Sequence, residues 1–377
     1  MANYFEMTRD ELTAEKAALE ENYKKFQAMG LKLNMARGKP GPHQMDLAMG
    51  LLQMTDYTTD AGTDARNYGD LEGLHEAREL FGDVMGVKPE EVFVGGNSSL
   101  QIMYNLISMG YCFGFPESPC PWSQVEKRKF LCPVPGYDRH FKLTQSFGFE
   151  LITIPMTPTG PDMDAVEEAI KDPAVKGIWG VPKYSNPEGI IYSKDTIIRM
   201  ASMKPAAPDF TIMWDNAYCV HEFEGDYVEF PDILHQCKKY GNYDMVYEFA
   251  STSKITFPSD GVACMATSEA NLEDFEKWIG IQTISYDKVN QQRHVLYLQN
   301  HAHTLKLMKK HAAFMAPKFE AVLSTLDREI APLEIASWSN PKGGYFISLY
   351  VRQADAGTVQ GGRCIHDRRR RHVPLRH

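Results

Sequence analysis

The sequence predicts an α/β protein in which a mostly parallel, seven-stranded sheet is flanked by helices and joined by a smaller α+β domain from both chain ends. Three observations predict this fold class. Short apolar segments alternate with helical segments between residues 90 and 266, which is typical of a parallel sheet covered on both faces. From residue 269 onward the pattern becomes helical and ends in one last strand. The length of 377 residues is sufficient for two domains.

Local signals define the elements in chain order. Thr8 and Glu11 form a capping box that starts an N-terminal helix, and Gly30 ends it. The apolar side chains of this helix share one face, at Leu12, Leu19, Tyr23 and Phe26. The helical region near the end is expected to break at Pro317. The seven strands of the sheet are expected at 92–94, 129–132, 151–154, 177–181, 211–214, 245–251 and 261–266, a separate strand at 345–350, and helices at 71–85, 100–109, 160–170 and 193–203.

Composition and charge exclude several classes of protein. Hydrophobic residues make up 43% of the chain and charged residues 24%, the ordinary balance of a globular protein, and no apolar run is long enough to predict a membrane span. The net charge of −9 argues against nucleic acid as the main partner. The seven cysteines are scattered, and the polar start of the chain lacks a signal core. We therefore expect a cytoplasmic protein without a membrane, nucleic-acid or metal site, since no histidine pair has metal-ligand spacing.

The loop GGNSS at 95–99 is the first candidate site. It lies between an expected strand and an expected helix, where free N–H groups, hydroxyls and the helix dipole together favour a phosphate. Its spacing matches neither the nucleoside triphosphate loop nor the dinucleotide fingerprint. An ordinary helix cap is the alternative interpretation. The side chains concerned are those of Asn97, Ser98 and Ser99.

Two ionisable side chains follow buried strands. Asp215 ends the apolar run Thr211–Trp214 and needs a cationic partner if it is buried, although a helix cap would also place an aspartate here. Lys254 directly follows the strand 245–251, where partial desolvation would lower its pKa and make it a nucleophile; an exposed lysine is the alternative. Tyr218 and Asn186 lie in neighbouring loops of the same kind.

Taken together, these groups fit pyridoxal phosphate. Its aldehyde requires an amine, its ring nitrogen requires an anion to remain protonated, its ring oxygen requires hydrogen-bond donors, and its phosphate requires a cradle. The sequence supplies each of these groups in a loop that follows a strand.

At this point the chain resembles the fold type I pyridoxal-phosphate-dependent aminotransferases of class I, and in particular a bacterial aspartate aminotransferase subgroup. The resemblance covers roughly residues 8–351 and rests on the order of several short motifs. These motifs are ARGKP (36–40), YGDLEG (68–73), GNSSL (96–100), PGY (135–137), NPEG (186–189), DNAY (215–218) and STSK (251–254).

The resemblance implies catalytic roles for three residues. Lys254 forms the Schiff base with the cofactor and later moves the substrate's Cα proton. Asp215 pairs with the pyridinium nitrogen, and Tyr218 hydrogen-bonds the ring oxygen. Asn186 contacts the same oxygen and approaches the substrate carboxylate, while Gly38 lines the substrate pocket.

The remaining implied roles concern the ring face, the phosphate and the partner. Tyr137 stacks on the ring, and Tyr68 reaches the phosphate of a neighbouring subunit, so the resemblance implies a homodimer with shared active sites. Phosphate contacts are implied for Asn97, Ser98, Ser99 and Ser251. The implied reaction moves the amino group of an L-amino acid, expected to be aspartate, to a 2-oxo acid, expected to be 2-oxoglutarate.

Two other functions fit the same residues. A C–S lyase or related eliminase would use Lys254 and Asp215 for different carbanion chemistry. A catalytically impaired remnant that still binds the cofactor is the other alternative, because two family features are missing. Where the family carries a phosphate-binding arginine after the lysine, this chain has Gly261-Val262-Ala263. The Arg-rich sequence of 352–377 does not match the family's segment that carries the carboxylate-binding arginine.

The expected domain organisation follows from these assignments. Residues 1–50 form an N-terminal helix and arm that belong to the small domain, and 51–290 form the large cofactor-binding domain. Residues 291–351 form an incomplete remainder of the small domain, and 352–377 form a disordered or non-native tail.

Overall fold

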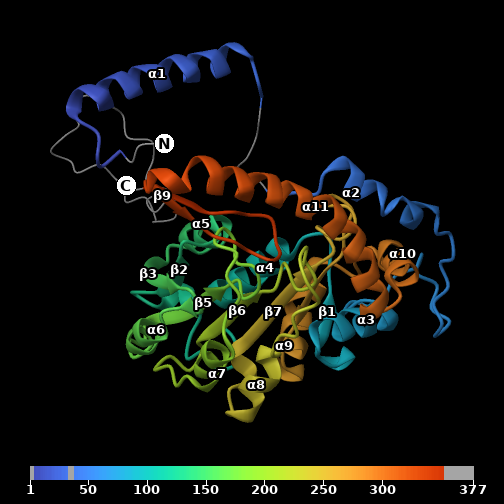
Figure 1. The fold of residues 1–377 in the computed structure, drawn as a ribbon. Helices are drawn as coiled ribbons and strands as arrows, with labels where there is room; N and C mark the ends of the chain where they lie inside the picture. Colours follow the sequence, from blue (N-terminus) through green and yellow to red (C-terminus); the bar gives the residue numbers. More distant parts are fainter. Residues whose placement is uncertain (1–3, 33–37, 352–377) are drawn as a thin grey trace.

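The computed structural model describes residues 4–32 and 38–351 (Figure 1). Its main element is a sheet of eight strands in the order β1-β8-β7-β6-β5-β2-β3-β4. The strands are β1 (Val92–Val94), β2 (Lys129–Val134), β3 (Glu150–Thr157), β4 (Gly160–Pro161), β5 (Val175–Gly180), β6 (Thr211–Asp215), β7 (Val246–Ser251) and β8 (Ala263–Ala266).

The expected fold class is confirmed, and the strand count requires one correction. The seven expected strands are all present, and β4 is an eighth that pairs antiparallel with the end of β3. It was missed because residues 160–170 read as one helix, whereas Asp162 caps a helix that begins only at Met163. The two residues before that cap are therefore free to pair with the sheet.

Strand direction determines where the connecting loops gather. Strands β2, β3, β5, β6 and β7 are mutually parallel. Strand β8 is antiparallel to both β7 and β1, so β1 runs in the same direction as the parallel set. The carboxyl ends of six strands therefore lie along one edge of the sheet, which is where open α/β sheets bind ligands.

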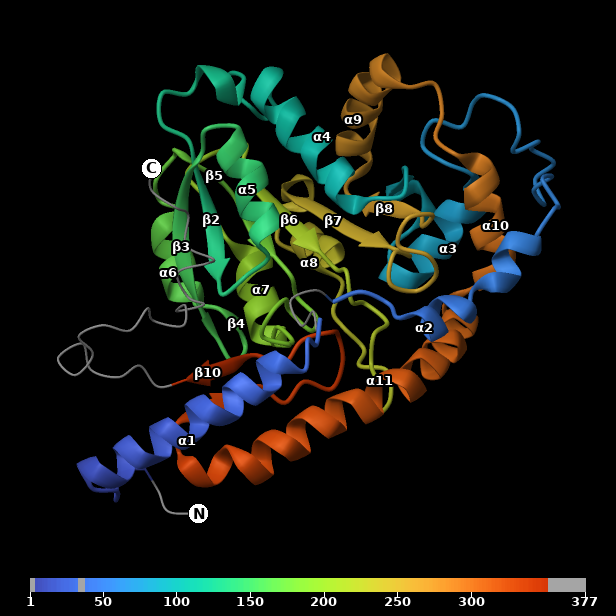
Figure 2. The ribbon, with the colours of Figure 1, turned by 90° about the horizontal axis from the view of Figure 1, so that it is seen from above.

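Helices cover both faces of the sheet, and Figure 2 shows the layers from above. Apolar side chains of α3, α6, α7 and α8 form the core on one face, and those of α4, α5 and α9 form the core on the other. The helices are α1 (Arg9–Ala28), α2 (Pro42–Asp46), α3 (His75–Met85), α4 (Ser99–Cys112), α5 (Asp138–Ser146), α6 (Met163–Ala169), α7 (Lys194–Ser202), α8 (Ile233–Lys239), α9 (Glu269–Gln282), α10 (Lys288–Leu298) and α11 (His301–Glu329).

Helix α11 corrects a second expectation. It continues through Pro317 instead of breaking there. A proline costs one backbone hydrogen bond, but the helix is anchored on either side of it, because Leu307 and Met308 pack into one cluster and Phe319 stacks against Phe223. Beyond α11 the chain forms a separate two-stranded sheet of β9 (Ala336–Trp338) and β10 (Leu349–Val351), so the strand expected at 345–350 begins later.

The N-terminal helix has the expected start. The hydroxyl of Thr8 accepts a hydrogen bond from the Glu11 N–H, and the Glu11 carboxylate accepts one from the Thr8 N–H. Its apolar stripe, however, is exposed, and none of the residues of α1 is buried. Figure 1 shows this helix lying apart from the sheet. Among the described helices, none is long and apolar enough to cross a membrane.

Candidate active site

The predicted cofactor residues come together at the carboxyl edge of the sheet. Asp215 is the last residue of β6, and Lys254 lies in the turn after β7, which is hydrogen-bonded to β6. Tyr137 follows β2 and Asn186 follows β5, the strand on the other side of β6. Parallel neighbouring strands thus present four of the predicted side chains at one place.

Asp215 has one engaged and one free oxygen. Its Oδ2 lies 3.0 Å from Nε2 of His140, and the side chains of both residues are almost completely buried. The His140 ring stacks on Trp179 at 4.4 Å between centroids, which fixes the ring plane. The other carboxylate oxygen, Oδ1, is buried without a hydrogen-bond partner. A buried, unsatisfied acceptor is costly unless a ligand completes it.

The Asp215 carboxylate interacts electrostatically with Lys254. Burial lowers the pKa of Lys254, while the Asp215 carboxylate opposes this shift. The Lys254 Nζ atom lies 4.8 Å from the centre of the Tyr218 ring. Burial, followed by the charge of Asp215, raises the pKa of the Tyr218 phenol well above its usual value, so Tyr218 remains a hydrogen-bond donor at neutral pH. A lysine with a lowered pKa has a larger fraction of neutral amine, the form that attacks an aldehyde.

A narrow pocket adjoins this group. Tyr137, His140, Trp179 and Asn186 are among its lining residues. The Tyr137 ring stands perpendicular to the His140 ring at 4.9 Å. An aromatic ring, an amide and the imidazole that pairs with Asp215 therefore line one small space.

The phosphate-cradle candidate lies next to the lysine turn. Asn97 donates from Nδ2 to the carbonyl of Ser259 at 2.9 Å, and Ser253 donates from Oγ to the Asn97 carbonyl at 3.4 Å. Ser98 is the N-cap of α4, but its side chain makes no capping hydrogen bond. Ser99 begins that helix, and Ser251 ends β7 beside it, both half-buried.

Two predicted residues lie outside this cluster. Tyr68 is 77% exposed, and its carbonyl accepts a hydrogen bond from Lys288. Gly38 packs against the segment that leads to β10, since a Cβ at this position would lie 2.6 Å from the Cβ of Tyr345 and 2.9 Å from the ring of Phe346. The roles predicted for both residues stay predictions.

Two histidines of the site are not among the residues that the sequence predicts. His140 lies three residues after Tyr137, on the first turn of α5, and this spacing is the one signal in the sequence that places both on one side of the loop. His221 lies three residues after Tyr218. It is buried with neither ring nitrogen hydrogen-bonded, and burial together with the Lys254 charge lowers its pKa to about 3. No sequence signal identified this environment.

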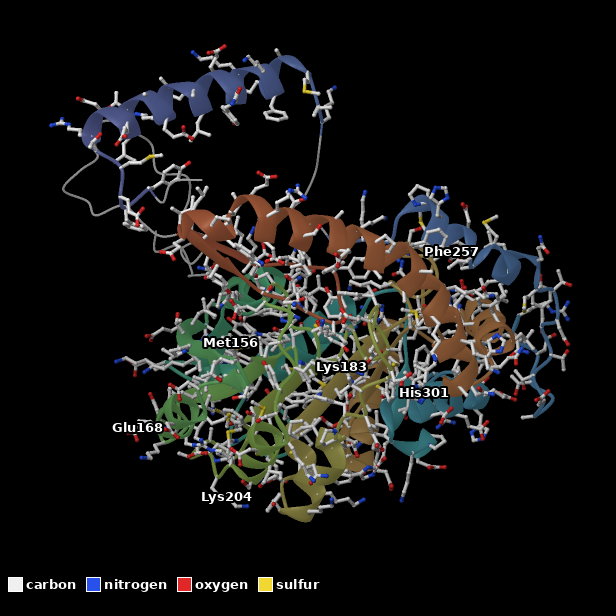
Figure 3. The ribbon with its side chains drawn as sticks, viewed as in Figure 1. Met156, Glu168, Lys183, Lys204, Phe257 and His301 are labelled. Atoms are coloured by element: carbon white, nitrogen blue, oxygen red, sulfur yellow. The ribbon has the colours of Figure 1, made fainter. Side chains whose placement is uncertain are left out.

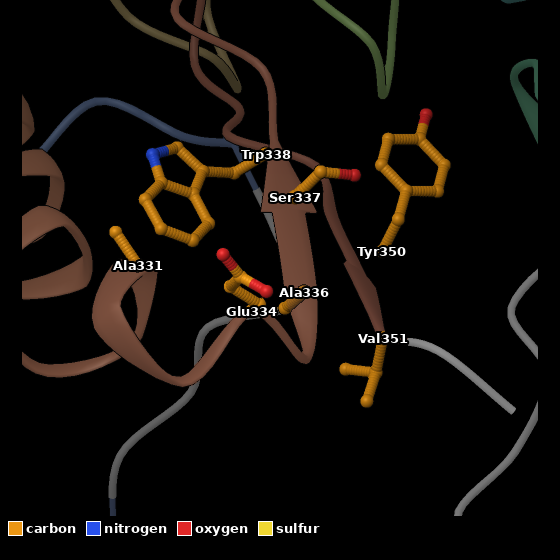
Figure 4. A pocket seen from close by; sticks show the side chains of 7 residues that line it. All are labelled: Ala331, Glu334, Ala336, Ser337, Trp338, Tyr350 and Val351. Carbon is orange, nitrogen blue, oxygen red and sulfur yellow. The ribbon is translucent and has the colours of Figure 1, made fainter. Parts of the chain in front are cut away.

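A cavity near the last described strand is a different feature. It has a volume of about 730 Å3 and lies along β9 and β10 (Figure 4). None of the predicted site residues lines it; its lining residues are Ala331, Glu334, Ala336, Ser337, Trp338, Tyr350 and Val351. Among the described residues no group of three or more histidine, cysteine, aspartate or glutamate side chains could hold a metal ion.

The donor set fits pyridoxal phosphate. The free Oδ1 of Asp215 could provide the anion for a pyridinium nitrogen, and Lys254 could provide the amine for the aldehyde. Tyr218 could provide a protonated phenol for the ring oxygen. Gly261, which begins the segment where the family carries its phosphate-binding arginine, packs closely against Thr252 and Ser253.

Comparison with known proteins identifies the family. A sequence model of the family described as aspartate amino-transferase matches residues 7–360. The chain is 44% identical over 344 residues to an aspartate aminotransferase of Corynebacterium glutamicum, which covers 90% of this chain and 80% of that protein. It is likewise 44% identical over 349 residues to a putative aminotransferase of Mycolicibacterium smegmatis, covering 91% of this chain and 82% of that one.

Solved structures give the same result. The crystal structure of an aspartate transaminase from Corynebacterium glutamicum has a TM-score of 0.90 and 42% identity, covering 93% of this chain and 83% of that chain. An α-aminoadipate aminotransferase from Thermus thermophilus, complexed with N-(5'-phosphopyridoxyl)-L-leucine, shares the fold at 21% identity and a TM-score of 0.65, covering 85% of this chain and 77% of that one. The chain belongs to the aspartate aminotransferase family, and it is an aminotransferase.

Proposed function

We propose that this chain transfers the amino group of L-aspartate to 2-oxoglutarate, with pyridoxal phosphate held by Lys254. The observation that carries the proposal is the buried, unpartnered Oδ1 of Asp215, whose second oxygen is already fixed by His140. The name of the Corynebacterium glutamicum relative supports aspartate as the donor. Pyridoxal phosphate, when bound, supplies an electron-accepting ring that makes the Cα–H of an amino acid acidic.

The chain's own residues would then bind, orient and move protons. Lys254 would hold the cofactor, and its Nζ would carry the proton between substrate and cofactor. Asp215, with its orientation fixed by His140, would keep the ring nitrogen protonated. Tyr218 and Asn186 would donate to the ring oxygen, and the N-terminus of α4 would hold the phosphate.

The assembly proposed for this function is a homodimer in which each Tyr68 reaches the phosphate of the other subunit. The exposure of Tyr68 on the surface of its own subunit supports this arrangement. A cytoplasmic location is also proposed, and it is supported by the six cysteines of the described residues, all of which are free thiols.

The test combines a spectrum with product analysis. The chain, purified with pyridoxal phosphate, should lose its visible absorption band when L-aspartate is added without an oxo acid, and should release oxaloacetate. Adding 2-oxoglutarate should restore the band and yield glutamate. Release of pyruvate and ammonia from a cysteine derivative would instead favour the C–S lyase. A visible band that aspartate leaves unchanged would favour the binding remnant.

A further inference from the structure

Lys183 is the most completely buried charged side chain near the active site and has no part in the proposed chemistry. It is 1% exposed, and it lies near the middle of the molecule (Figure 3). Its Nζ atom donates to the carbonyl oxygens of Cys219 at 2.7 Å and Val228 at 2.9 Å. It also forms an ion pair with Glu222 at 2.5 Å and lies 4.1 Å from the centre of the Tyr227 ring.

A buried ammonium is an expensive way to stabilise a fold. Desolvation of the two charges offsets most of their attraction, and apolar residues of similar volume often stabilise a protein equally well. Burial indeed lowers the pKa of Lys183, and the Glu222 carboxylate opposes that shift. The position of this ion pair in the chain suggests why a charge is used here.

Lys183 joins the two loops that carry the donors proposed for the cofactor ring oxygen. It belongs to the loop after β5, three residues before Asn186. Its hydrogen bond to the Cys219 carbonyl fixes the residue that directly follows Tyr218. Tyr218 also packs in an apolar cluster with Val181 and Tyr184 of the loop that carries Asn186. Apolar packing of this kind is not directional, whereas the hydrogen bond from Lys183 fixes the backbone next to Tyr218 at a defined position.

The next residue connects the same loops to a third segment. Tyr184 is buried in the left-handed backbone region, with φ at 49°. Its ring lies against Gly343, where a Cβ would approach to 2.5 Å, and Gly344 also packs on it. The residues that follow these glycines, Tyr345 and Phe346, pack against Gly38. A left-handed non-glycine residue persists only where its surroundings hold it in place.

We propose that Lys183 is a positioning residue for the cofactor ring, whose ammonium group fixes Tyr218 and Asn186 relative to each other. The inference rests on the proposed binding of pyridoxal phosphate between Lys254 and Asp215. Lys183 acts through the Cys219 carbonyl and through its own loop, and it takes no part in proton transfer.

The experiment uses the pH at which the visible band of the lysine-bound cofactor changes. A phenol that donates to the ring oxygen stabilises negative charge there and so favours the deprotonated form of the linkage. Removing both charges with Lys183→Met/Glu222→Gln should loosen Tyr218 and raise this midpoint by about 0.5 to 1 pH unit, the equivalent of most of one hydrogen bond. Cofactor affinity should fall roughly fivefold for the same reason.

The chain offers a matched control on β5, the strand that precedes the loop of Lys183. Lys176 and Asp209 form an equally buried pair at 2.7 Å near the start of β5, away from the carboxyl ends of the strands. The variant Lys176→Met/Asp209→Asn should lower the melting temperature but leave the midpoint and the cofactor affinity unchanged. An equal shift of the midpoint in this control would reduce Lys183 to a general structural role and overturn the proposal.

A milder variant protects the test against misfolding. Lys183→Gln/Glu222→Gln is also charge-neutral and keeps an N–H donor toward the carbonyls, so its midpoint should rise by a smaller amount. A wild-type midpoint in either folded Lys183 variant would refute the positioning role and leave the proposed function intact. A wild-type chain with no visible band would refute the proposed function itself.

Discussion

The His140–Asp215 pair gives a prediction that can be worked out from the structure. In His140→Ala the carboxylate of Asp215 would lose its only hydrogen-bond partner among the described residues and keep its burial. The stacking contact between His140 and Trp179 would be lost as well. The variant therefore removes both the orientation of the carboxylate and the packing behind it.

The size of the effect follows from the burial of the pair. A hydrogen bond to a charged group is worth about 1.5 to 3 kcal/mol, and the upper part of this range applies because an unpaired charge remains buried. For a chain of this length, about 2.5 kcal/mol corresponds to a fall of roughly 3 °C in melting temperature. Cofactor affinity should fall by at least about tenfold, since Asp215 is no longer held toward the ring nitrogen.

Thermal unfolding with and without pyridoxal phosphate measures both effects. A suitable control is His235→Ala, because His235 also pairs with a carboxylate, Glu91, but lies on α8 away from the site. The control should lose stability without any change in cofactor affinity. If His140→Ala binds the cofactor as tightly as the wild type, the role assigned to the pair is wrong.

Three further predictions concern the surroundings of the site. Burial lowers the pKa of the His221 ring from 6.5 to about 3, so between these pH values the folded state binds fewer protons than the unfolded state. The free energy of unfolding is therefore highest above pH 6.5 and falls as the pH decreases, by about 2 kcal/mol at pH 5. In urea titrations, His221→Leu should lack this dependence of the unfolding free energy on pH. Burial raises the pKa of the Glu248 carboxyl from 4.5 to about 8, so its contribution to the free energy of unfolding is largest below pH 4.5 and is lost as the pH rises through 8. Glu248→Gln should therefore raise the urea midpoint at pH 8.5 more than at pH 5. Gly38→Ala should cost about 1 to 3 kcal/mol of unfolding free energy by overpacking against Tyr345 and should raise the KM for the amino acid, whereas Gly41→Ala, with its nearest neighbouring atom 3.8 Å away, should do neither.

Much of the fold could be predicted because it depends on local patterns of apolar and capping residues in the sequence. Each buried strand of the parallel set is a short apolar run, and most helices carry a capping side chain at their start, as Thr8 and Ser193 show. The misses arise where distant packing overrides the local signal. Pro317 interrupts the pattern of α11 but not the helix, and β4 forms only because the end of β3 lies beside it.

The candidate site was predictable to the extent that its residues follow strands. Asp215 and Lys254 were found because a polar side chain after an apolar run is a local signal, and parallel strands bring such positions together. The pairs His140–Asp215 and Lys183–Glu222 join residues 75 and 39 positions apart, and no spacing rule connects them. The tail at 352–377 lies outside the described residues, so its predicted character stays a prediction.

The central claim is that Lys254 holds pyridoxal phosphate opposite Asp215. The most direct measurement reduces the protein–cofactor linkage with borohydride, digests the chain and locates the added mass by mass spectrometry. The account predicts a single phosphopyridoxyl group on Lys254 in the wild type and none in Lys254→Ala. A phosphopyridoxyl group on another lysine, or an unchanged visible band in Lys254→Ala, would contradict it.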